Sequence, residues 1–515
     1  MTDLPRIAEP SETNQHLDAN EISPAETTIA LSVLFVRENW RKLITISAIV
    51  LLPCFWHRHI EASDLGSHTY NAWLAQLIDH GQISGLHIAR IWDNVLFDLL
   101  LNGLAKLLPL LIAEKIAVSL IVLVFFWGAF TFVAAAAKRP PWYLAPAIAM
   151  AAYGWTFEMG FCNYYLSLGI SFFGLAIFWR GKGWQRLILL LLAPLVWFAH
   201  PIGLAWMLGA AIYIELCRII PLWYRGLLFP SAAAAIFLVH RFLFHRYIAD
   251  ANAGPRYFFN GADQLILYGI RYWIPAAAFL IFVAAIVGAC LIRERRDPSL
   301  WPRLSLPAQL YLLVALGILW LPDGIHLPEF PAALALITER VTSISLVLLC
   351  CLASVGRPRK WHLAGFSAIA IVFFTFLYED TATVSRMETH VERLLNVLPP
   401  GQRVFATIWP PSGSRVLVQH IVDRACIGRC FSYGNYEPAS HAFRIRVDRP
   451  NPYAMNDFKS TTEMEAGTYM VKPQDLPAYQ IYQCRADWTD LCIRMLAAGE
   501  DNDRLGALTA RGQRR

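Results

Sequence analysis

The chain has few charged side chains for its length. Asp, Glu, Lys and Arg make up 16% of the 515 residues and 56% are hydrophobic, whereas roughly 25% of a typical soluble domain is charged. The shortage is concentrated in long apolar runs that alternate with short basic clusters. Because a helix needs roughly 20 mostly apolar residues to cross a bilayer, this composition argues against an ordinary soluble protein and predicts an integral membrane protein.

Three motifs of soluble catalysis are also missing. The chain contains no Walker phosphate loop, no HExxH motif and no GxSxG motif. A soluble nucleotide-using site is therefore not expected. The net charge of +6 does not indicate nucleic acid, because the basic residues stand between apolar runs rather than along one exposed face. We expect no nucleic-acid partner.

The N-terminus lacks an apolar core and a cleavage site. Its first 30 residues are polar and contain prolines, a composition typical of disorder, and we predict a disordered cytoplasmic segment over 1–36. The first apolar run, within 43–57, starts late and no small-residue cleavage motif follows it. We therefore expect this run to be retained as an anchor.

The cysteines divide into two groups. Six lie in apolar runs, where cysteine is usually a small buried residue: Cys54, Cys162, Cys217, Cys290, Cys350 and Cys351. Four lie in the polar tail: Cys426, Cys430, Cys484 and Cys492. An even number of cysteines in an exported domain predicts disulfides. Metal binding is the alternative, and it is weaker because the C-x-x-C spacing is absent.

About eleven segments approach the length and apolarity of a membrane span. They are 43–57, 114–136, 140–157, 160–179, 185–199, 201–222, 225–243, 265–292, 305–321, 332–355 and 361–378. Every second connection is basic, namely 37–42, 138–139, 180–186, 218–225, 293–303 and 357–360. The positive-inside rule assigns these connections to the cytoplasm. It predicts a multi-pass protein of the cytoplasmic (inner) membrane with its N-terminus inside and its C-terminal segment outside.

Residues 93–112 decide this topology. The segment is apolar, but Asp98, Asn102 and Lys106 recur at helical spacing as a polar stripe, and Pro109 interrupts its end. We therefore predict a helix on or partly in the outer interface rather than a further span. A crossing here would turn every later basic connection outward and place the tail cysteines in the reducing cytoplasm.

Three parts follow: the N-terminal segment 1–36, a transmembrane core over 37–378 whose first outer loop is 57–113, and a small outer α/β domain over 379–515. In the last part we predict helices over 386–398 and 489–499, and strands over 403–409, 415–422, 468–473 and 479–484. The stretch 432–465 is predicted to be irregular. Either it covers a functional site or binds a substrate, or it is a structural cap.

A few ionisable residues of the predicted outer side stand out. Glu339 and Arg340 lie within an apolar stretch, where charges usually face a cavity or a partner; the alternative is that both extend to a nearby interface. Glu158 and His200 lie at tight outer turns, and ordinary loop residues are the alternative there. Arg271 falls on the same side.

The first outer loop has the richest pattern. Its apolar residues at helical spacing are Tyr70, Trp73, Leu74, Leu77 and Ile78. This spacing predicts an amphipathic helix at the membrane surface, with Asp64 just before it. From spacing alone, the better interpretation of Asp64 is a cap of this helix; the alternative is a base held rigidly at the membrane surface.

This layout resembles the GT-C superfamily of membrane glycosyltransferases, most closely the protein mannosyltransferase and aminoarabinose transferase branch. The likeness rests on a first span, an outer loop with an acidic residue, an amphipathic interfacial helix and a second, partly apolar helix. It extends to the many-span core and the small outer C-terminal domain. It is a likeness of organisation over the whole chain rather than of an exact motif.

The resemblance implies transfer of a sugar from a polyprenyl-phosphate donor to an acceptor in the cell envelope. It implies that Asp64, within EASDLGSH, is the catalytic base, with Glu61 as second choice. Glu158 corresponds to a further acidic residue between the third and fourth spans. Arg340 or Arg271 is implied to steady the donor phosphate. A divalent cation would fit this chemistry, although no ligand cluster requires one.

His68, His200 and Glu339 complete the set of candidate substrate-binding residues. Two other functions are open at this stage. One is a transporter or flippase of lipid-linked glycans, which internal repeats and helices broken near the midplane would favour; we find no convincing repeat. The other is a non-catalytic membrane scaffold with the same fold.

Overall fold

The computed structural model describes residues 24–221, 223–251, 258–418, 420–485 and 487–502. The chain divides into two compact units, 1–49 and 50–515. The described part of the first unit belongs to helix α1 (Pro24–Leu51). The predicted disorder over 1–36 is therefore wrong for 24–36, where the apolar run from Ile29 to Val36 continues the helix; residues 1–23 lie outside the described residues.

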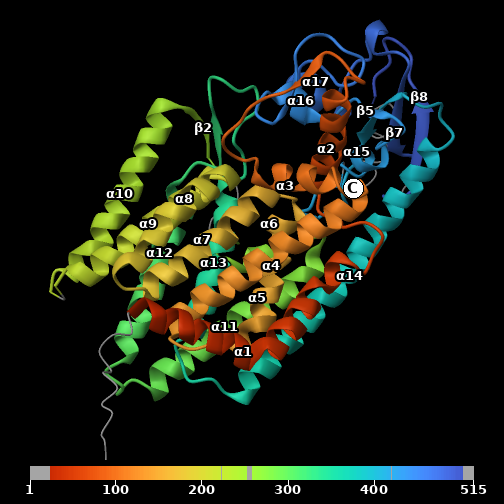
Figure 1. Cartoon of the computed structure of the whole chain (residues 1–515). Helices are drawn as coiled ribbons and strands as arrows, with labels where there is room; N and C mark the ends of the chain where they lie inside the picture. Colours follow the sequence, from red (N-terminus) through yellow and green to blue (C-terminus); the bar gives the residue numbers. More distant parts are fainter. Residues whose placement is uncertain (1–23, 222, 252–257, 419, 486, 503–515) are drawn as a thin grey trace, which may run out of the picture. The chain divides into compact units, whose positions relative to one another are not determined.

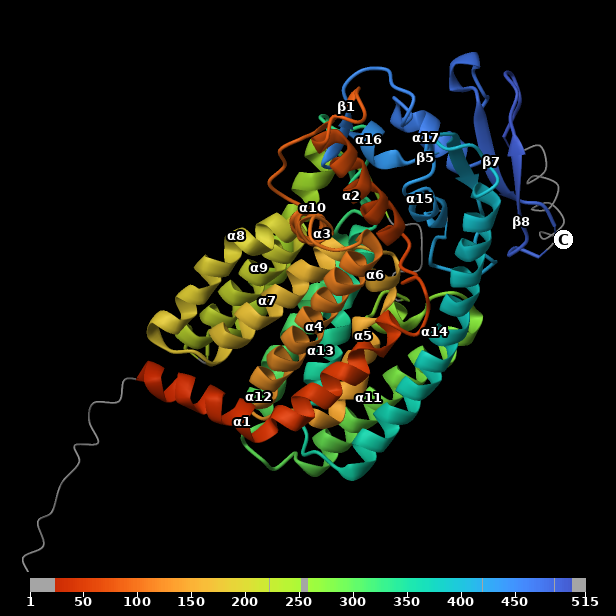
Figure 2. The same ribbon diagram turned by 45° about the vertical axis from the view of Figure 1, so that its right-hand side comes forward.

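Helices dominate the unit 50–515 (Figures 1 and 2). They are α2 (Leu65–Asp79), α3 (Leu96–Ala105), α4 (Leu110–Ala137), α5 (Ala145–Ala152), α6 (Trp155–Glu158), α7 (Cys162–Arg180), α8 (Ile188–Ala199), α9 (Pro201–Ile219), α10 (Arg225–Arg246), α11 (Trp273–Arg293), α12 (Leu300–Trp320), α13 (Ile337–Ala353) and α14 (Lys360–Leu395). Three further short helices, α15 (Ile421–Ala425), α16 (Tyr436–Ser440) and α17 (Phe458–Glu465), and a small sheet follow in the C-terminal part.

Among the described residues, seven helical segments are long and apolar enough to cross a membrane. They are α4, α7, α9, α10, Ile270–Arg293 (which contains α11), α12 and α14. Of the four remaining predicted spans, 43–57 overlaps the end of α1. The other three correspond to shorter or interrupted helices; 140–157, for example, is divided at the extended backbone of Gly154 into α5 and α6. The protein is mostly helical and compatible with a multi-pass membrane protein, while the count of about eleven crossings stays a prediction.

The segment 93–112 forms α3 and then the start of α4. α3 has 10 residues, about 15 Å of helix against a hydrocarbon core of about 30 Å, so α3 alone is too short to cross. Its polar stripe turns toward protein: Asp98 bonds to His68 and Asn163, and Asn102 is buried, whereas Lys106 is exposed. The stripe therefore serves internal contacts more than an interface with water.

α2 also differs from its expected surroundings. Tyr70 and Leu74, on its apolar face, are buried. The Tyr70 hydroxyl accepts a hydrogen bond from the Ser432 backbone N–H at 2.9 Å, and Trp73 stacks on Phe431. This face packs against the C-terminal segment, so the pattern that predicted a helix on the membrane surface reflects a protein contact instead.

The C-terminal part contains a four-stranded sheet in the order β5 (Phe431–Ser432), β4 (Arg403–Thr407), β7 (Ala478–Gln483), β8 (Leu491–Met495). β4 is parallel to β5 and β7, and β8 is antiparallel to β7. The strands predicted at 403–409 and 479–484 are confirmed. The strand predicted at 415–422 is wrong, because its described residues form a loop up to 418 and the start of α15 (Ile421–Ala425). In 468–473 the described residues have only an isolated bridge from Met470 to Asp501.

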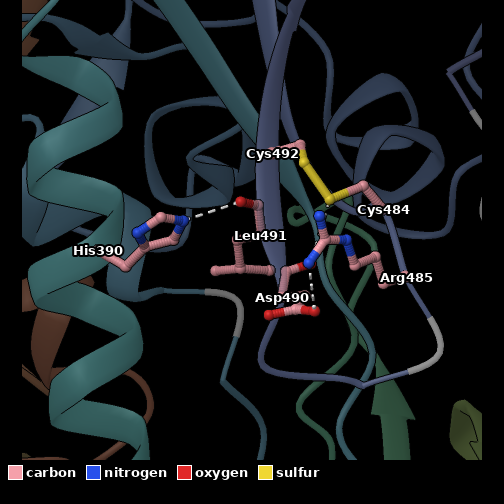
Figure 3. Close-up of a disulfide and its surroundings, with 6 residues drawn as sticks. All are labelled: His390, Cys484, Arg485, Asp490, Leu491 and Cys492. Atoms are coloured by element: carbon pink, nitrogen blue, oxygen red, sulfur yellow. Dashed lines mark hydrogen bonds and ion pairs between the residues drawn. A yellow bond between two sulfur atoms is a disulfide. The ribbon is translucent and has the colours of Figure 1, made fainter.

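The helix predicted at 489–499 is also wrong, because Leu491–Met495 is strand β8. Two contacts hold this strand in place (Figure 3). A disulfide joins Cys484 to Cys492 across the β7–β8 turn. His390 of α14 donates from Nε2 to the Leu491 carbonyl at 2.9 Å. Pairing with β7 thus outweighs the local helical pattern.

The stretch 432–465 is more ordered than predicted. It contains α16 (Tyr436–Ser440), β6 (Ile445–Val447) and α17 (Phe458–Glu465). β6 pairs antiparallel with β1 (Leu86–Ile88) of the first outer loop, so the C-terminal segment and that loop share a sheet. A second small sheet pairs β2 (Ile248–Asp250) with β3 (Gly324–His326).

α14 joins the apolar helices to the C-terminal sheet. The span predicted at 361–378 and the helix predicted at 386–398 are one continuous helix of 36 residues. Figure 2 shows α14 running beside the helical core and reaching strands β7 and β8. The boundary predicted between 378 and 379 therefore falls inside a helix.

The cysteines behave as their surroundings predict. Besides Cys484–Cys492, a disulfide joins Cys426 to Cys430 immediately after α15. Of the six cysteines in apolar runs, five are buried and Cys217 is half-buried. The prediction of disulfides in the tail is confirmed, and both bridges are local.

A buried charge cluster fixes α15 against the helical core. The Arg424 guanidinium lies 2.5 Å from Glu388 of α14, 2.9 Å from Glu114 of α4 and 3.6 Å from Glu61 of the first outer loop. All four side chains are at most 3% exposed. With three carboxyl groups on one cation, burial and the charge of Glu388 raise the pKa of Glu61 well above its ordinary value.

Removing the cation of this cluster should strongly destabilise the protein. In the variant Arg424→Met three buried carboxyl groups lose their cation, and breaking a buried pair in this way costs about 3–5 kcal/mol. We expect the free energy of unfolding in detergent to fall by about that amount. Arg485→Met is the control, since Arg485 lies 3.7 Å from Asp490 and its side chain is 78% exposed (Figure 3). Equal losses in both variants would contradict the role of Arg424.

Candidate functional site

Four residues singled out from the sequence line one cavity. Asp64, His68, His200 and Arg340 surround a space of about 70 Å³. It lies where helices begin: Asp64 precedes α2, His200 precedes α9, and Arg340 is in the first turn of α13. The first residues of α7 form another wall, and Tyr436 and Phe443 of the C-terminal segment complete it.

Asp64 does not cap α2. It occupies the position before the helix, but its backbone is already helical (φ −64°, ψ −12°), and among the described residues its carboxylate makes no capping hydrogen bond. A capping side chain usually belongs to a residue with extended backbone, so the cap interpretation is wrong. The Asp64 Oδ1 instead lies 3.4 Å from Nε2 of His420.

His420 links Asp64 to a second carboxylate. Its Nδ1 lies 2.9 Å from Oδ2 of Asp423, and the Ser432 hydroxyl donates to the other oxygen of Asp423. Burial alone would lower the pKa of His420, but the hydrogen bond and charge of Asp423, together with the charge of Asp64, raise it to about 10. His420 is therefore a buried cation between two carboxylates at neutral pH.

Arg340 brings a second cation to the cavity. Its guanidinium lies over the ring of Phe161, 4.1 Å from the ring centre. Its Nε is buried without a hydrogen-bond partner, and no carboxylate of the described residues forms an ion pair with it. Because buried charges are normally paired, this arrangement suits an anionic ligand in the cavity.

The two predicted histidines have different roles. His68 Nδ1 lies 2.7 Å from Oδ1 of Asp98, whose other oxygen accepts from Asn163. Burial would lower the pKa of His68, but Asp98 outweighs it and raises the pKa to about 9. His200 Nδ1 accepts the Ile202 N–H at 3.2 Å and so caps α9. This leaves the Nε2–H of a neutral His200 as a donor.

Arg271 and Glu339 are not among the residues that line the cavity. Arg271 forms ion pairs with Glu379 at 2.6 Å and Asp380 at 2.9 Å, both on α14. Of the two arginines implied to bind a phosphate, only Arg340 faces the cavity.

Glu158 and Glu61 are also placed elsewhere. Glu158 is buried and accepts a hydrogen bond from the Tyr268 hydroxyl at 2.9 Å; burial raises the pKa of Glu158 well above its ordinary value. Glu61 belongs to the Arg424 cluster. Neither lines the cavity around Asp64. Of the two acidic residues of the first outer loop that were candidates for the base, Asp64 and Glu61, only Asp64 lines this cavity.

Sequence analysis missed the residues that the C-terminal segment contributes. His420 and Asp423 are three positions apart, which brings two side chains together at the start of a helix. The strand predicted over 415–422 contains only His420, and positions three apart would point to opposite faces of a strand. Tyr436 and Phe443 come from the stretch 432–465, for which a role over the active site was one of the two interpretations. Their position in the cavity wall places this stretch over the cavity.

The described residues contain no group of three or more His, Cys, Asp and Glu side chains that could hold a metal ion. A comparison with known proteins finds no family model, no curated protein and no solved structure that matches this chain.

The charge on His420 predicts a pH-dependent contribution to stability. Its pKa is higher in the folded protein, about 10, than the ordinary 6.5, so the contribution is complete below about pH 6.5. It is lost as the pH rises through about 10. The loss of stability caused by His420→Gln should therefore be larger at about pH 6 than at about pH 10, measured by unfolding in detergent.

The matched control for this experiment is His87→Gln, because the His87 side chain is 46% exposed. We expect it to have a small effect at both pH values. A loss for His420→Gln that is the same at both pH values would contradict a charged His420.

Proposed function

We propose that the protein is a membrane glycosyltransferase of the GT-C type, which moves a sugar from a polyprenyl-phosphate donor to an extracytoplasmic acceptor. One observation carries the proposal. Asp64, a carboxylate held by the buried His420, lines the same cavity as Arg340. Arg340 has no ion pair among the described residues. These two side chains are a base and an anion-binding group, the two functions that this transfer requires.

The distribution of charge along the helices supports an outer position for the cavity. α7 and α9 begin at the cavity and end near Arg180 and Arg218, and α13 leads from Arg340 to the basic connection 357–360. The positive-inside rule assigns the basic ends to the cytoplasm. We therefore propose that the cavity lies on the outer side of the inner membrane, with about eleven crossings when the shorter helices are included.

In the proposed reaction an acceptor hydroxyl attacks the anomeric carbon of the donor sugar. Asp64 takes the proton of that hydroxyl as the new C–O bond forms. The bond between the anomeric carbon and the phosphate oxygen breaks, and the polyprenyl phosphate leaves with the electron pair. Arg340 offsets the charge that develops on this phosphate, a contact suited to its bidentate fork.

His420 supports Asp64 by holding its position, since its Nε2 lies 3.4 Å from the Asp64 carboxylate. Its second nitrogen is fixed by Asp423, so the imidazole holds the Asp64 carboxylate in one orientation. We assign His420 and Asp423 as positioning residues for the base.

The aromatic walls fit a sugar better than a small ion. Phe161, Tyr436 and Phe443 line the cavity, and sites for small organic ligands are typically apolar and aromatic with a few placed polar groups. Two of these rings belong to the C-terminal segment. We therefore propose that this segment helps to select the sugar or the acceptor.

The proposal is tested with the purified protein and labelled polyprenyl-phosphate sugars. Loss of the base in Asp64→Asn should lower the transfer rate by about 10²- to 10⁴-fold. Asp79→Asn is the matched control, because Asp79 is the last residue of the same helix and is exposed; we expect it to keep full activity. Both variants are first compared by their thermal unfolding.

Three results would contradict the proposal. Full transfer by Asp64→Asn would remove Asp64 as the base. Failure of every donor, together with movement of labelled lipid between leaflets, would favour a transporter. Failure of every donor without such movement would favour a scaffold.

A further inference from the structure

A second cavity lies at the other end of the helices. It has a volume of about 320 Å³ and is formed where α11 ends at Arg293 and α14 begins at Lys360. Both helices are apolar enough to cross a membrane. The cavity is therefore at the depth where a crossing helix meets the lipid headgroups, away from the starts of α7, α9 and α13 that surround Asp64.

The charges around this cavity do not cancel. Its two acidic residues are already engaged: Asp297 lies 3.0 Å from Arg303, and Glu294 accepts the backbone N–H of Arg357 at 3.1 Å. Among the described residues, the side chains of Arg293, Arg357 and Arg359, which also line it, form no ion pair. An excess of positive charge therefore faces the cavity.

Two arginines that do not line the cavity, Arg139 and Arg303, hold its wall in place. Arg139 donates to the carbonyls of Ser354 and Gly356, and Arg303 donates to that of Val355 at 3.3 Å. These bonds fix the turn that presents Arg357 and Arg359. The arginines are thus displayed on a braced turn rather than on a loop without contacts.

Apolar surface continues directly from the charged rim. Ile286 lines the cavity about two turns before Arg293, and Trp361 lines it from α14. Beside it Ile292 is 73% exposed and Leu363 is 47% exposed. A cationic cavity with a tryptophan and exposed aliphatic side chains matches a ligand that has an anionic head and an apolar body.

We propose that this cavity binds a phosphate-bearing ligand through Arg293, Arg357 and Arg359, and that the phosphodiester headgroup of an anionic lipid is the source that its surroundings favour. The planar guanidinium of arginine suits two hydrogen bonds to phosphate oxygens. Basic cavities between helix ends at the membrane surface bind the headgroups of anionic lipids. The site is separate from the proposed transfer reaction and does not depend on it.

The test uses the full-length protein in detergent, titrated with phosphatidylglycerol or phosphatidylcholine, with bound lipid counted by native mass spectrometry. We expect tighter binding of phosphatidylglycerol. The double variant Arg357→Gln/Arg359→Gln should weaken it by about twenty- to thirty-fold, as expected for two surface cations near an anionic headgroup. Both side chains are exposed, so the fold should persist.

The matched control is Arg295→Gln/Arg296→Gln, which removes the same charge from exposed positions that do not line the cavity. It should change binding by less than about three-fold. Arg357→Lys/Arg359→Lys keeps the charge and should retain most of the binding. Equal losses in the site and control variants, a Lys variant as weak as the Gln variant, or no preference for phosphatidylglycerol would overturn the proposal.

A competition experiment separates the two sources of phosphate. Sodium phosphate is added at millimolar concentration to the protein with bound phosphatidylglycerol. Retention of the lipid supports the headgroup site. Displacement that requires Arg357 and Arg359 supports phosphate binding but assigns the site to a soluble ligand, which overturns the lipid assignment.

Discussion

One buried arginine determines where the C-terminal segment meets the helices. Arg424 forms ion pairs with carboxyl groups from the first outer loop, α4 and α14, and a buried charge that loses its partners is costly. α15 therefore has one favourable position, and this position carries His420 to Asp64. The contact is close: a Cβ atom added at Gly66 would lie 2.3 Å from the His420 carbonyl oxygen. The proposed base depends on a partner that is distant in sequence and is delivered by this docking.

The same electrostatic principle organises the two ends of the helices. At one end, cations and carboxylates are buried together around a small aromatic cavity, where charge interactions are strong because water is largely excluded. At the other end, arginines are exposed around a larger cavity, where they suit a membrane surface. In our proposals, the basic connection 357–360 therefore serves both as a topology signal and as part of a phosphate-binding cavity.

The sequence predicted what depends on local pattern. Apolar runs identified the helices because a membrane or a packed core requires apolar length, and scarce charges such as Arg340 were visible against that background. His420 and Asp423 were missed because 415–422 reads locally as a strand. The adjacent helix α15 is instead held by ion pairs between Arg424 and carboxyl groups that are distant in the sequence. β8 was missed for a similar reason, since its pairing with β7 is a tertiary contact.

The docking of the C-terminal segment on the first outer loop is tested most directly by a cross-link between β1 and β6. His87 and Arg446 face each other in register, and facing Cα atoms of antiparallel strands are about 4.5–5.5 Å apart, within the range of a disulfide. The account predicts that His87→Cys/Arg446→Cys forms a disulfide in native membranes, detected as linked peptides by mass spectrometry, while His87→Cys/Lys459→Cys does not. Free, alkylatable thiols at 87 and 446 would contradict it.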